Sequence, residues 1–188
     1  VVALAGVALA ATLTMTGCAA ATPGDSASSG DSGSSGAAKN YKITYLPKNL
    51  GNPYFDASDK AGKTAVEGFD GTYAEVGPTT ATADGQVSYI NTLTQQKVGA
   101  IVLSANDVNA LCDAIGSAKA AGVKVVTFDS DTKPGCRDVY VSASSTDLIG
   151  KGQMDIMAKQ IGEKGQVAIL SASANATNQN AWNAAMKT

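Results

Sequence analysis

Short apolar stretches alternate with stretches of helical patterning along most of the chain. The apolar stretches lie at residues 42–47, 72–76, 99–104, 123–128 and 138–142, and helical patterning separates the first four of them. Parallel strands need long crossover connections, and crossover helices cover both faces of the sheet. The alternation therefore predicts an α/β fold built on a Rossmann-like, doubly wound parallel sheet.

The helices expected between these strands begin at residues typical of helix starts. Pro53 stands in the first turn of a helix expected at 53–68, and Asp84 and Asp107 are the expected N-caps of the next two helices. The third of these helices is expected to end at Gly122.

A second set of elements follows the fifth apolar stretch. A helix is expected at 146–162, then an apolar strand at 166–171 and a helix at 178–187. Because this strand–helix pair only begins a new unit, we predict a first lobe at 41–143. We predict a crossover with an incomplete second lobe at 144–188, and a chain truncated at both ends.

The first 40 residues differ in composition from the rest. Residues 1–13 are apolar and uncharged, too short for a membrane span of about 20 residues, and typical of a secretory signal whose start is missing. The segment ends in Met15, Thr16, Gly17 and Cys18. An apolar residue, two small ones and then cysteine resemble a bacterial lipobox, in which the thiol is lipidated. The alternative is a buried cysteine in a short helix. We predict a lipoprotein signal peptide at 1–18 and a flexible Ser/Gly/Ala-rich tether at 19–40.

Composition argues against several classes of function. The formal charge of −2 gives no reason to expect nucleic acid as a partner, since nucleic acid favours basic faces. The chain has no histidine, which is the commonest general base and metal ligand, and its three cysteines lie far apart in sequence. No phosphate-binding glycine motif or nucleophile elbow follows a predicted strand. We therefore predict no cofactor, no metal and no catalytic residue.

Polar and aromatic residues follow the first predicted strand at its carboxyl end, where doubly wound sheets bind ligands. They are Lys48, Asn52, Tyr54 and Phe55. Ammonium and amide groups pair with sugar hydroxyls, and aromatic rings pack on the C–H face of a sugar. The alternative interpretation is a well-capped loop with both rings in the core.

Two further segments carry candidate ligand groups. Asp129 and Asp131 follow the fourth strand and can accept hydrogen bonds from sugar hydroxyls. The same pair also fits the acids of a glycosidase, a cation site or the capping of turns. Asn178, Gln179 and Trp182 at the last helix suit a polyol, but they also fit a helix cap with a buried indole. The residues alone leave these alternatives open.

Cys112 and Cys136 are the cysteines that remain if Cys18 is lipidated. Cys112 lies early in a predicted helix and Cys136 in the loop after the next strand, so the two can meet at one end of the sheet. Outside the cytoplasm such cysteines are usually bridged. We expect a disulfide, and two reduced thiols are the alternative.

Three segments together resemble a known family. They are PKNLGNPYFD from Pro47, VVTFDSD ending at Asp131 and TNQNAW ending at Trp182. In this order and spacing they resemble the type I periplasmic sugar-binding proteins of ABC importers, in the branch of the rhamnose-binding proteins and the autoinducer-2 receptor, over about residues 41–188. The resemblance implies two lobes that close on a sugar without chemistry, and docking to importer membrane subunits. With the lipobox, it implies a monomer anchored to the outer face of the cell membrane.

Carried over position by position, the resemblance implies a set of ligand contacts: Lys48, Asn52, Tyr54, Phe55, Asp129, Asp131, Asn178 and Gln179. One position departs from the autoinducer-2 receptor, which has an Asp–Gln pair where this chain has Asn178-Gln179. An amide donates as well as accepts, whereas a carboxylate only accepts, and the clustered hydroxyls of autoinducer-2 need acceptors. We therefore expect rhamnose or a related deoxyhexose. Autoinducer-2 is the alternative ligand, and a glycosidase is a third hypothesis.

Overall fold

The computed structural model describes residues 41–187. The predicted signal peptide, the lipidation site Cys18 and the tether lie outside the described residues. Five strands form one fully parallel sheet in the order β2-β1-β3-β4-β5. Their bounds are Lys42–Leu46 (β1), Thr72–Glu75 (β2), Ala100–Leu103 (β3), Lys124–Phe128 (β4) and Val139–Val141 (β5).

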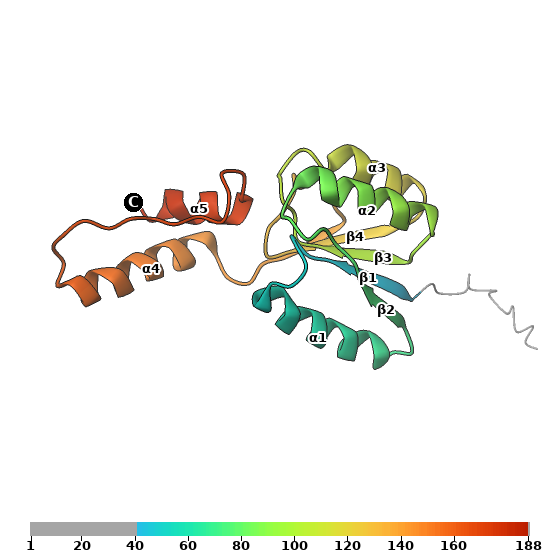
Figure 1. The fold of residues 1–188 in the computed structure, drawn as a ribbon, viewed down its shortest axis with the longest axis horizontal. Coiled ribbons are helices and arrows are strands. Elements are labelled where there is room, and N and C mark those ends of the chain that lie inside the picture. Colours follow the sequence, from blue (N-terminus) through green and yellow to red (C-terminus); the bar gives the residue numbers. More distant parts are fainter. Residues whose placement is uncertain (1–40, 188) are drawn as a thin grey trace, which may run out of the picture. The chain divides into compact units, whose positions relative to one another are not determined.

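Helices cover both faces of this sheet. Helix α1 lies on one face and α2 and α3 lie side by side on the other (Figure 1). The five helices are Pro53–Glu67 (α1), Ala83–Gln95 (α2), Cys112–Ala120 (α3), Thr146–Ile161 (α4) and Thr177–Ala185 (α5). The fold is therefore the predicted doubly wound α/β fold, and the strand order reverses between β1 and β3. In such sheets ligands bind at the carboxyl ends of the strands beside that reversal.

The hydrophobic core lies between the sheet and the two helices α2 and α3. Ile90 and Leu93 of α2 are buried, as the helical spacing predicts, and they pack with Ile115 of α3 against the strands. Strands β1, β3 and β4 supply fully buried side chains: Leu46, Ile101, Leu103 and Val125. Burying apolar side chains of this size contributes about 1.5–3 kcal/mol each, so this layer fixes where the strand ends lie.

Two predicted helix caps are wrong. Thr82, not Asp84, caps α2, because its side chain accepts a hydrogen bond from the Gly85 N–H at 3.3 Å. Asp107 accepts from the N–H groups of Asn109 and Ala110, at 2.7 and 2.9 Å. It therefore caps a separate turn, and α3 begins only at Cys112 without a side-chain cap.

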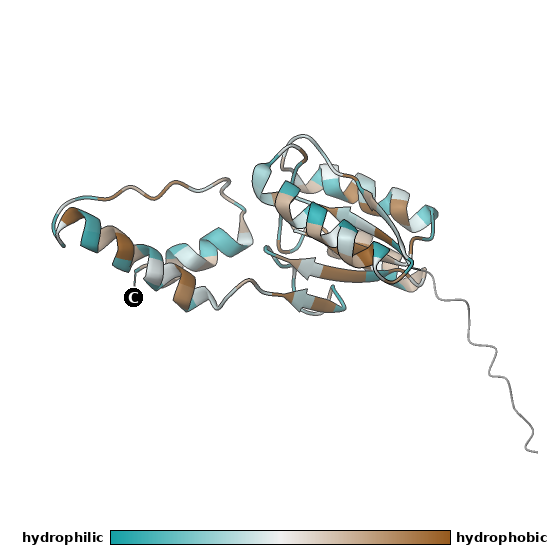
Figure 2. Cartoon of the chain, turned by 90° about the horizontal axis from the view of Figure 1, so that it is seen from below, coloured by the Kyte–Doolittle hydropathy of each residue, from teal (hydrophilic) through white to brown (hydrophobic). Residues whose placement is uncertain are grey.

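The strand predicted at 166–171 does not form. The segment that joins α4 to α5 carries several apolar residues (Figure 2), yet it pairs with no strand among residues 41–187. Its apolar side chains are consequently exposed, and Leu170 is 99% exposed. Alternating apolar residues predict a strand only where a neighbouring strand can accept its hydrogen bonds.

Helices α4 and α5 pack against each other through a glycine. A Cβ atom built at Gly150 would lie 2.6 Å from the Ala185 Cβ and 2.8 Å from the Trp182 carbonyl oxygen. Only glycine allows this approach. The contact holds the C-terminal half of α5 against α4. Asn178 and Gln179 lie in the first turn of the same helix.

Candidate functional site

The carboxylate of Asp129 is the centre of the site. Asp129 follows directly after β4 in the left-handed region, at φ 55°, which few residues other than glycine adopt. Its Oδ2 accepts from the Ser104 hydroxyl at 2.7 Å. Its Oδ1 accepts from the Asn178 Nδ2 at 2.9 Å and from the Tyr54 hydroxyl at 3.3 Å. The Asp129 side chain is only 9% exposed, so these donors replace most of its water.

Lys48 is the cation that faces this carboxylate. Its Nζ lies 3.7 Å from the Asp129 Oδ2 and donates to the Asn178 Oδ1 at 3.2 Å. Burial lowers the pKa of Lys48, and the nearby carboxylate opposes that shift without cancelling it. Lys48, Asp129 and Asn178 thus form a triangle in which the amide from α5 touches both charges.

The two aromatic residues at the start of α1 have different roles in the packing. Phe55 is 3% exposed and packs edge-on against Phe128, with ring centroids 6.2 Å apart. Tyr54 is largely exposed. Burial of its hydroxyl and the Asp129 charge raise the pKa of Tyr54. Asn52 caps α1 by accepting from the Tyr54 N–H at 3.1 Å. The hypothesis of buried rings therefore holds for Phe55 and not for Tyr54.

These groups line a cavity of about 290 Å³ at the carboxyl edge of the sheet. Every residue that the sequence predicts as a ligand contact lines it except Asp131. The lining residues are Lys48, Asn49, Asn52, Tyr54, Phe55, Ala81, Asn106, Asp129, Ala172, Ser173, Ala176, Asn178, Gln179 and Trp182. The cavity therefore brings together side chains from the loops that follow β1 and β4 and from helices α1 and α5. Two of them in direct contact, Lys48 and Asn178, are 130 residues apart in sequence.

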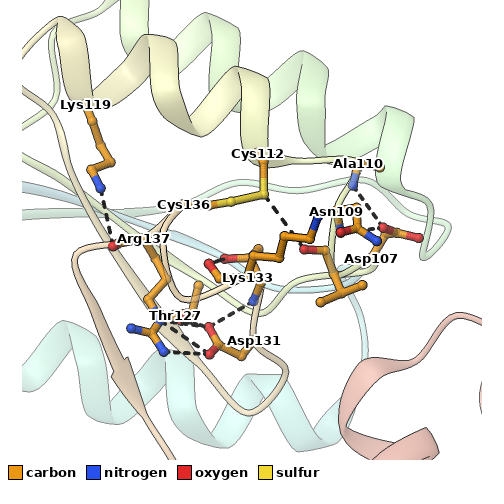
Figure 3. Close-up of a disulfide and its surroundings, with 12 residues drawn as sticks. Asp107, Asn109, Ala110, Cys112, Lys119, Thr127, Asp131, Lys133, Cys136 and Arg137 are labelled. Atoms are coloured by element: carbon orange, nitrogen blue, oxygen red, sulfur yellow. Dashed lines mark hydrogen bonds and ion pairs between the residues drawn. A yellow bond between two sulfur atoms is a disulfide. The ribbon is translucent and has the colours of Figure 1, made fainter.

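Asp131 has a different environment. Its carboxylate binds both Nε and Nη2 of Arg137, the shortest contact being 2.9 Å, and it also accepts from the Thr127 hydroxyl (Figure 3). Asp131 lines a neighbouring cavity of about 250 Å³ instead of the first one. Asp131 does not line the first cavity, and Arg137, Thr127 and the Thr132 N–H all bond to its carboxylate. The geometry therefore favours a structural role over the ligand contact that the resemblance implies.

A disulfide holds the loop that carries this ion pair. Cys112 at the start of α3 is bonded to Cys136, the residue before Arg137 (Figure 3). The Lys119 ammonium group also donates to the Arg137 carbonyl oxygen at 3.3 Å. The bridge therefore ties α3 to the loop that follows β4, from which Asp129 projects.

Sequence reasoning missed several residues of the site. Ser104, which holds Asp129, and Asn106, which lines the cavity, both follow β3. The rule that located Lys48 and Asp129 at strand ends applies equally to these two. Gln179 lines the cavity, but its Oε1 accepts from the Ser171 hydroxyl and the Ala172 N–H, both at 2.7 Å. It holds the adjoining segment in place.

The chemistry of this cavity is that of polar recognition. It offers donors, one carboxylate acceptor and the exposed ring of Tyr54. Within residues 41–187, no cluster of three or more His, Cys, Asp or Glu side chains is arranged to hold a metal ion. No helix in the described part of the chain is long and apolar enough to span a membrane.

Comparison with known families agrees with this geometry. Residues 43–188 match the model of the periplasmic binding protein domain. The chain belongs to the periplasmic binding protein family.

Three solved structures show what the chain is similar to. An ABC transporter solute-binding protein from Clostridium phytofermentas with bound L-rhamnose is 36% identical, with a TM-score of 0.75. A sugar ABC transporter protein from Actinomyces odontolyticus is 42% identical, with a TM-score of 0.61. LsrB from Clostridium saccharobutylicum in complex with AI-2 is 31% identical, with a TM-score of 0.70.

These similarities cover the folded part of this chain but only part of the relatives. Each match includes 77% of this chain and 45%, 47% and 47% of the three solved chains, respectively. The chain thus spans about half the length of these relatives.

Proposed function

We propose that this chain contributes the first lobe and the opening of the second lobe of a sugar-binding protein of an ABC importer, and that the ligand is rhamnose or a related deoxyhexose. The observation that carries the proposal is the cavity at the sheet edge. There Asn178, which lies in α5 after the crossover, donates a hydrogen bond to Asp129 of the nearly buried Lys48–Asp129 pair. The similarity to a relative with bound L-rhamnose supports the same choice of ligand.

The proposed mechanism is capture by closure of two lobes on the ligand. Lys48 donates to sugar oxygens, Asp129 accepts from a hydroxyl, and Tyr54 and Trp182 offer rings to the C–H face. Closure is a hinge motion, and a buried hydroxyl without a partner would cost about 1–3 kcal/mol. The site therefore discriminates sugars by how completely their hydroxyls are paired.

The choice between rhamnose and autoinducer-2 depends on Asn178. Its NH2 already donates to Asp129 and its oxygen accepts from Lys48. The same oxygen also accepts from the Gln179 N–H. Because an amide both donates and accepts, a ligand that replaces one of these partners can offer either an acceptor or a donor. Autoinducer-2 presents mainly donors, which a carboxylate at this position would satisfy better. Autoinducer-2 remains the alternative ligand, because the AI-2-bound LsrB is also similar to this chain.

We further propose that the protein acts outside the cytoplasm, is anchored to the cell membrane through a lipid on Cys18 and passes its ligand to the importer's membrane subunits as a monomer. Recovery in the membrane fraction with release only by detergent, and loss of this anchoring in Cys18→Ala, would support the anchor. A wild-type protein that stays in the aqueous fraction would contradict it.

Calorimetric titration with L-rhamnose tests the ligand. The full chain that the gene encodes is used, since the matched relatives are about twice as long as this chain. Saturable binding that Asp129→Ala abolishes is the expected result. If the protein binds autoinducer-2 and not L-rhamnose, the position of the site stands and the proposed ligand changes. If it binds neither, the proposed function is overturned.

A further inference from the structure

A buried glutamine lies behind the binding cavity. Gln86, in the first turn of α2, is 0% exposed although its side chain is polar. At the preceding position, a Cβ atom on Gly85 would lie 2.9 Å from the Pro78 Cβ, so glycine allows the start of α2 to lie close to Pro78. A buried amide is tolerated only when its hydrogen bonds are made, so its partners show what it does.

Gln86 bonds to backbone groups just beyond the ends of two strands. Its Nε2 donates to the carbonyl oxygens of Ser104 at 2.7 Å and Pro47 at 3.0 Å. Its Oε1 accepts from the Asn106 N–H at 2.9 Å. Pro47 follows β1, and Ser104 and Asn106 follow β3. One side chain thus fastens both strand ends at the point where the strand order reverses.

The backbone that Gln86 holds carries the groups that face the cavity. The Ser104 hydroxyl donates to Asp129, and Lys48 is the residue after Pro47. Asn106 links the two loops directly, because its Nδ2 donates to the Lys48 carbonyl oxygen at 2.9 Å. A displacement of any of these carbonyls would therefore move the ammonium group, the carboxylate or the Asn106 amide.

We propose that Gln86 is a positioning residue for ligand binding, which sets the separation between the Lys48 loop and the loop after β3 without touching the ligand. This inference rests on the proposed function. An apolar side chain at this position would pack in the core but would remove the partner of three backbone groups. The backbone would then shift so that these groups could bond to water or to other partners. The expected effect of losing Gln86 is therefore on affinity as well as on stability.

The test compares Gln86→Met with Ile90→Val in the full chain. Both sites lie on the buried face of α2, but Ile90 packs only in the hydrophobic core. Calorimetry is performed at a temperature at which each variant is fully folded by circular dichroism. We expect Gln86→Met to weaken L-rhamnose binding at least tenfold. We expect Ile90→Val to lower the melting temperature and leave the dissociation constant within twofold of the wild-type value.

Amide hydrogen exchange gives a second reading of the same variants. The Asn106 N–H should exchange faster in Gln86→Met, because its acceptor is gone, and should remain protected in Ile90→Val. Equal dissociation constants for wild type and folded Gln86→Met would overturn the positioning role while leaving the proposed function intact. A wild-type protein that binds no sugar would instead overturn the proposed function, and this inference with it.

Gln86→Glu keeps the experiment decisive if Gln86→Met does not fold. Glutamate preserves the shape and the acceptor for the Asn106 N–H, and it loses at least one of the two donations to Pro47 and Ser104. We expect binding at least threefold weaker than wild type, between the values for wild type and Gln86→Met where both are measured. Wild-type affinity in folded Gln86→Glu would contradict the proposal.

Discussion

Replacing Asp129 by asparagine should damage both the stability and the affinity of the protein. The substitution keeps the shape of the side chain and removes its charge. Oδ1 and Oδ2 each accept from donors, so whichever position the new NH2 takes, it faces a donor: either Asn178 and Tyr54, or Ser104 and Lys48. No orientation of an amide reproduces the bonds of the carboxylate.

The size of the stability loss follows from the Lys48–Asp129 pair. At 3.7 Å, Coulomb's law gives an attraction of about 1 kcal/mol in water and about 4 kcal/mol at an effective dielectric constant of 20. The two side chains are 12% and 9% exposed, so the upper part of this range applies. Breaking a buried pair also leaves the remaining charge unpaired. We expect Asp129→Asn to lower the free energy of unfolding by about 2–4 kcal/mol.

The affinity loss has a separate cause. A hydrogen bond from a ligand hydroxyl to a charged acceptor is worth about 1.5–3 kcal/mol, which corresponds to roughly 10- to 150-fold in the dissociation constant. Urea unfolding measures the stability and calorimetry with L-rhamnose measures the affinity. An Asp129→Asn protein with wild-type unfolding midpoint and wild-type affinity would refute both the electrostatic reasoning and the position of the site.

Two companion variants isolate the cause. Adding Lys48→Met to Asp129→Asn removes the unpaired ammonium group, so the double variant should be more stable than the sum of the single effects predicts. Asp131→Asn is the matched control, because Asp131 follows the same strand but pairs with Arg137. It should destabilise the protein and leave the affinity within about twofold. A large loss of affinity in Asp131→Asn would instead support the ligand contact that the sequence resemblance implies for Asp131.

Two further predictions concern the five-stranded sheet and its helices. Replacing Cys112 and Cys136 together by serine opens a 24-residue loop and should lower the free energy of unfolding by about 3 kcal/mol. Urea unfolding with and without reductant measures this loss. If reductant still destabilised the double variant, the prediction would be contradicted. Burial and the hydrogen bond to Asp59 raise the pKa of Tyr73 above 10. The folded state therefore holds this proton more tightly than the unfolded state, and the resulting stability is present below pH 10 and lost as the pH rises further. Tyr73→Phe should show a smaller fall in melting temperature between pH 9.5 and 11, and an unchanged fall would count against this assignment.

The sequence predicts the parallel sheet and the helices that flank it well, because their signals are local. Each strand is a short apolar run, and each helix has a periodic buried face, such as Ile90 and Leu93 on α2. The strand-end rule then locates Lys48 and Asp129 at one edge without any knowledge of packing. Errors of a few residues, as at Asp84 and Asp107, arise because Ser, Thr and Asp compete as caps and only the backbone geometry decides between them.

The remaining features depend on contacts between distant residues. The role of Asp131 follows from Arg137, which a disulfide to α3 holds in reach, and nothing in the local sequence shows that pairing. The segment 166–171 has the composition of a strand, but strand formation needs a neighbouring strand. The role of Gln86 is hidden for a similar reason, since a glutamine in a helical pattern is expected on the surface.

The donors around Asp129 divide into fixed and exchangeable ones. Ser104 and Tyr54 precede β5 in the chain, as does Lys48, whose carbonyl oxygen accepts from Asn106. Asn178 is the donor to this carboxylate that comes from beyond β5. In the proposed function, a ligand hydroxyl can take the place of the Asn178 NH2 at the Asp129 Oδ1 and leave the other bonds of the carboxylate unchanged. Because Asn178 already donates to this carboxylate, ligand binding exchanges one hydrogen bond for others. The ligand that binds best is therefore the one that also provides new partners for Lys48 and for the released amide.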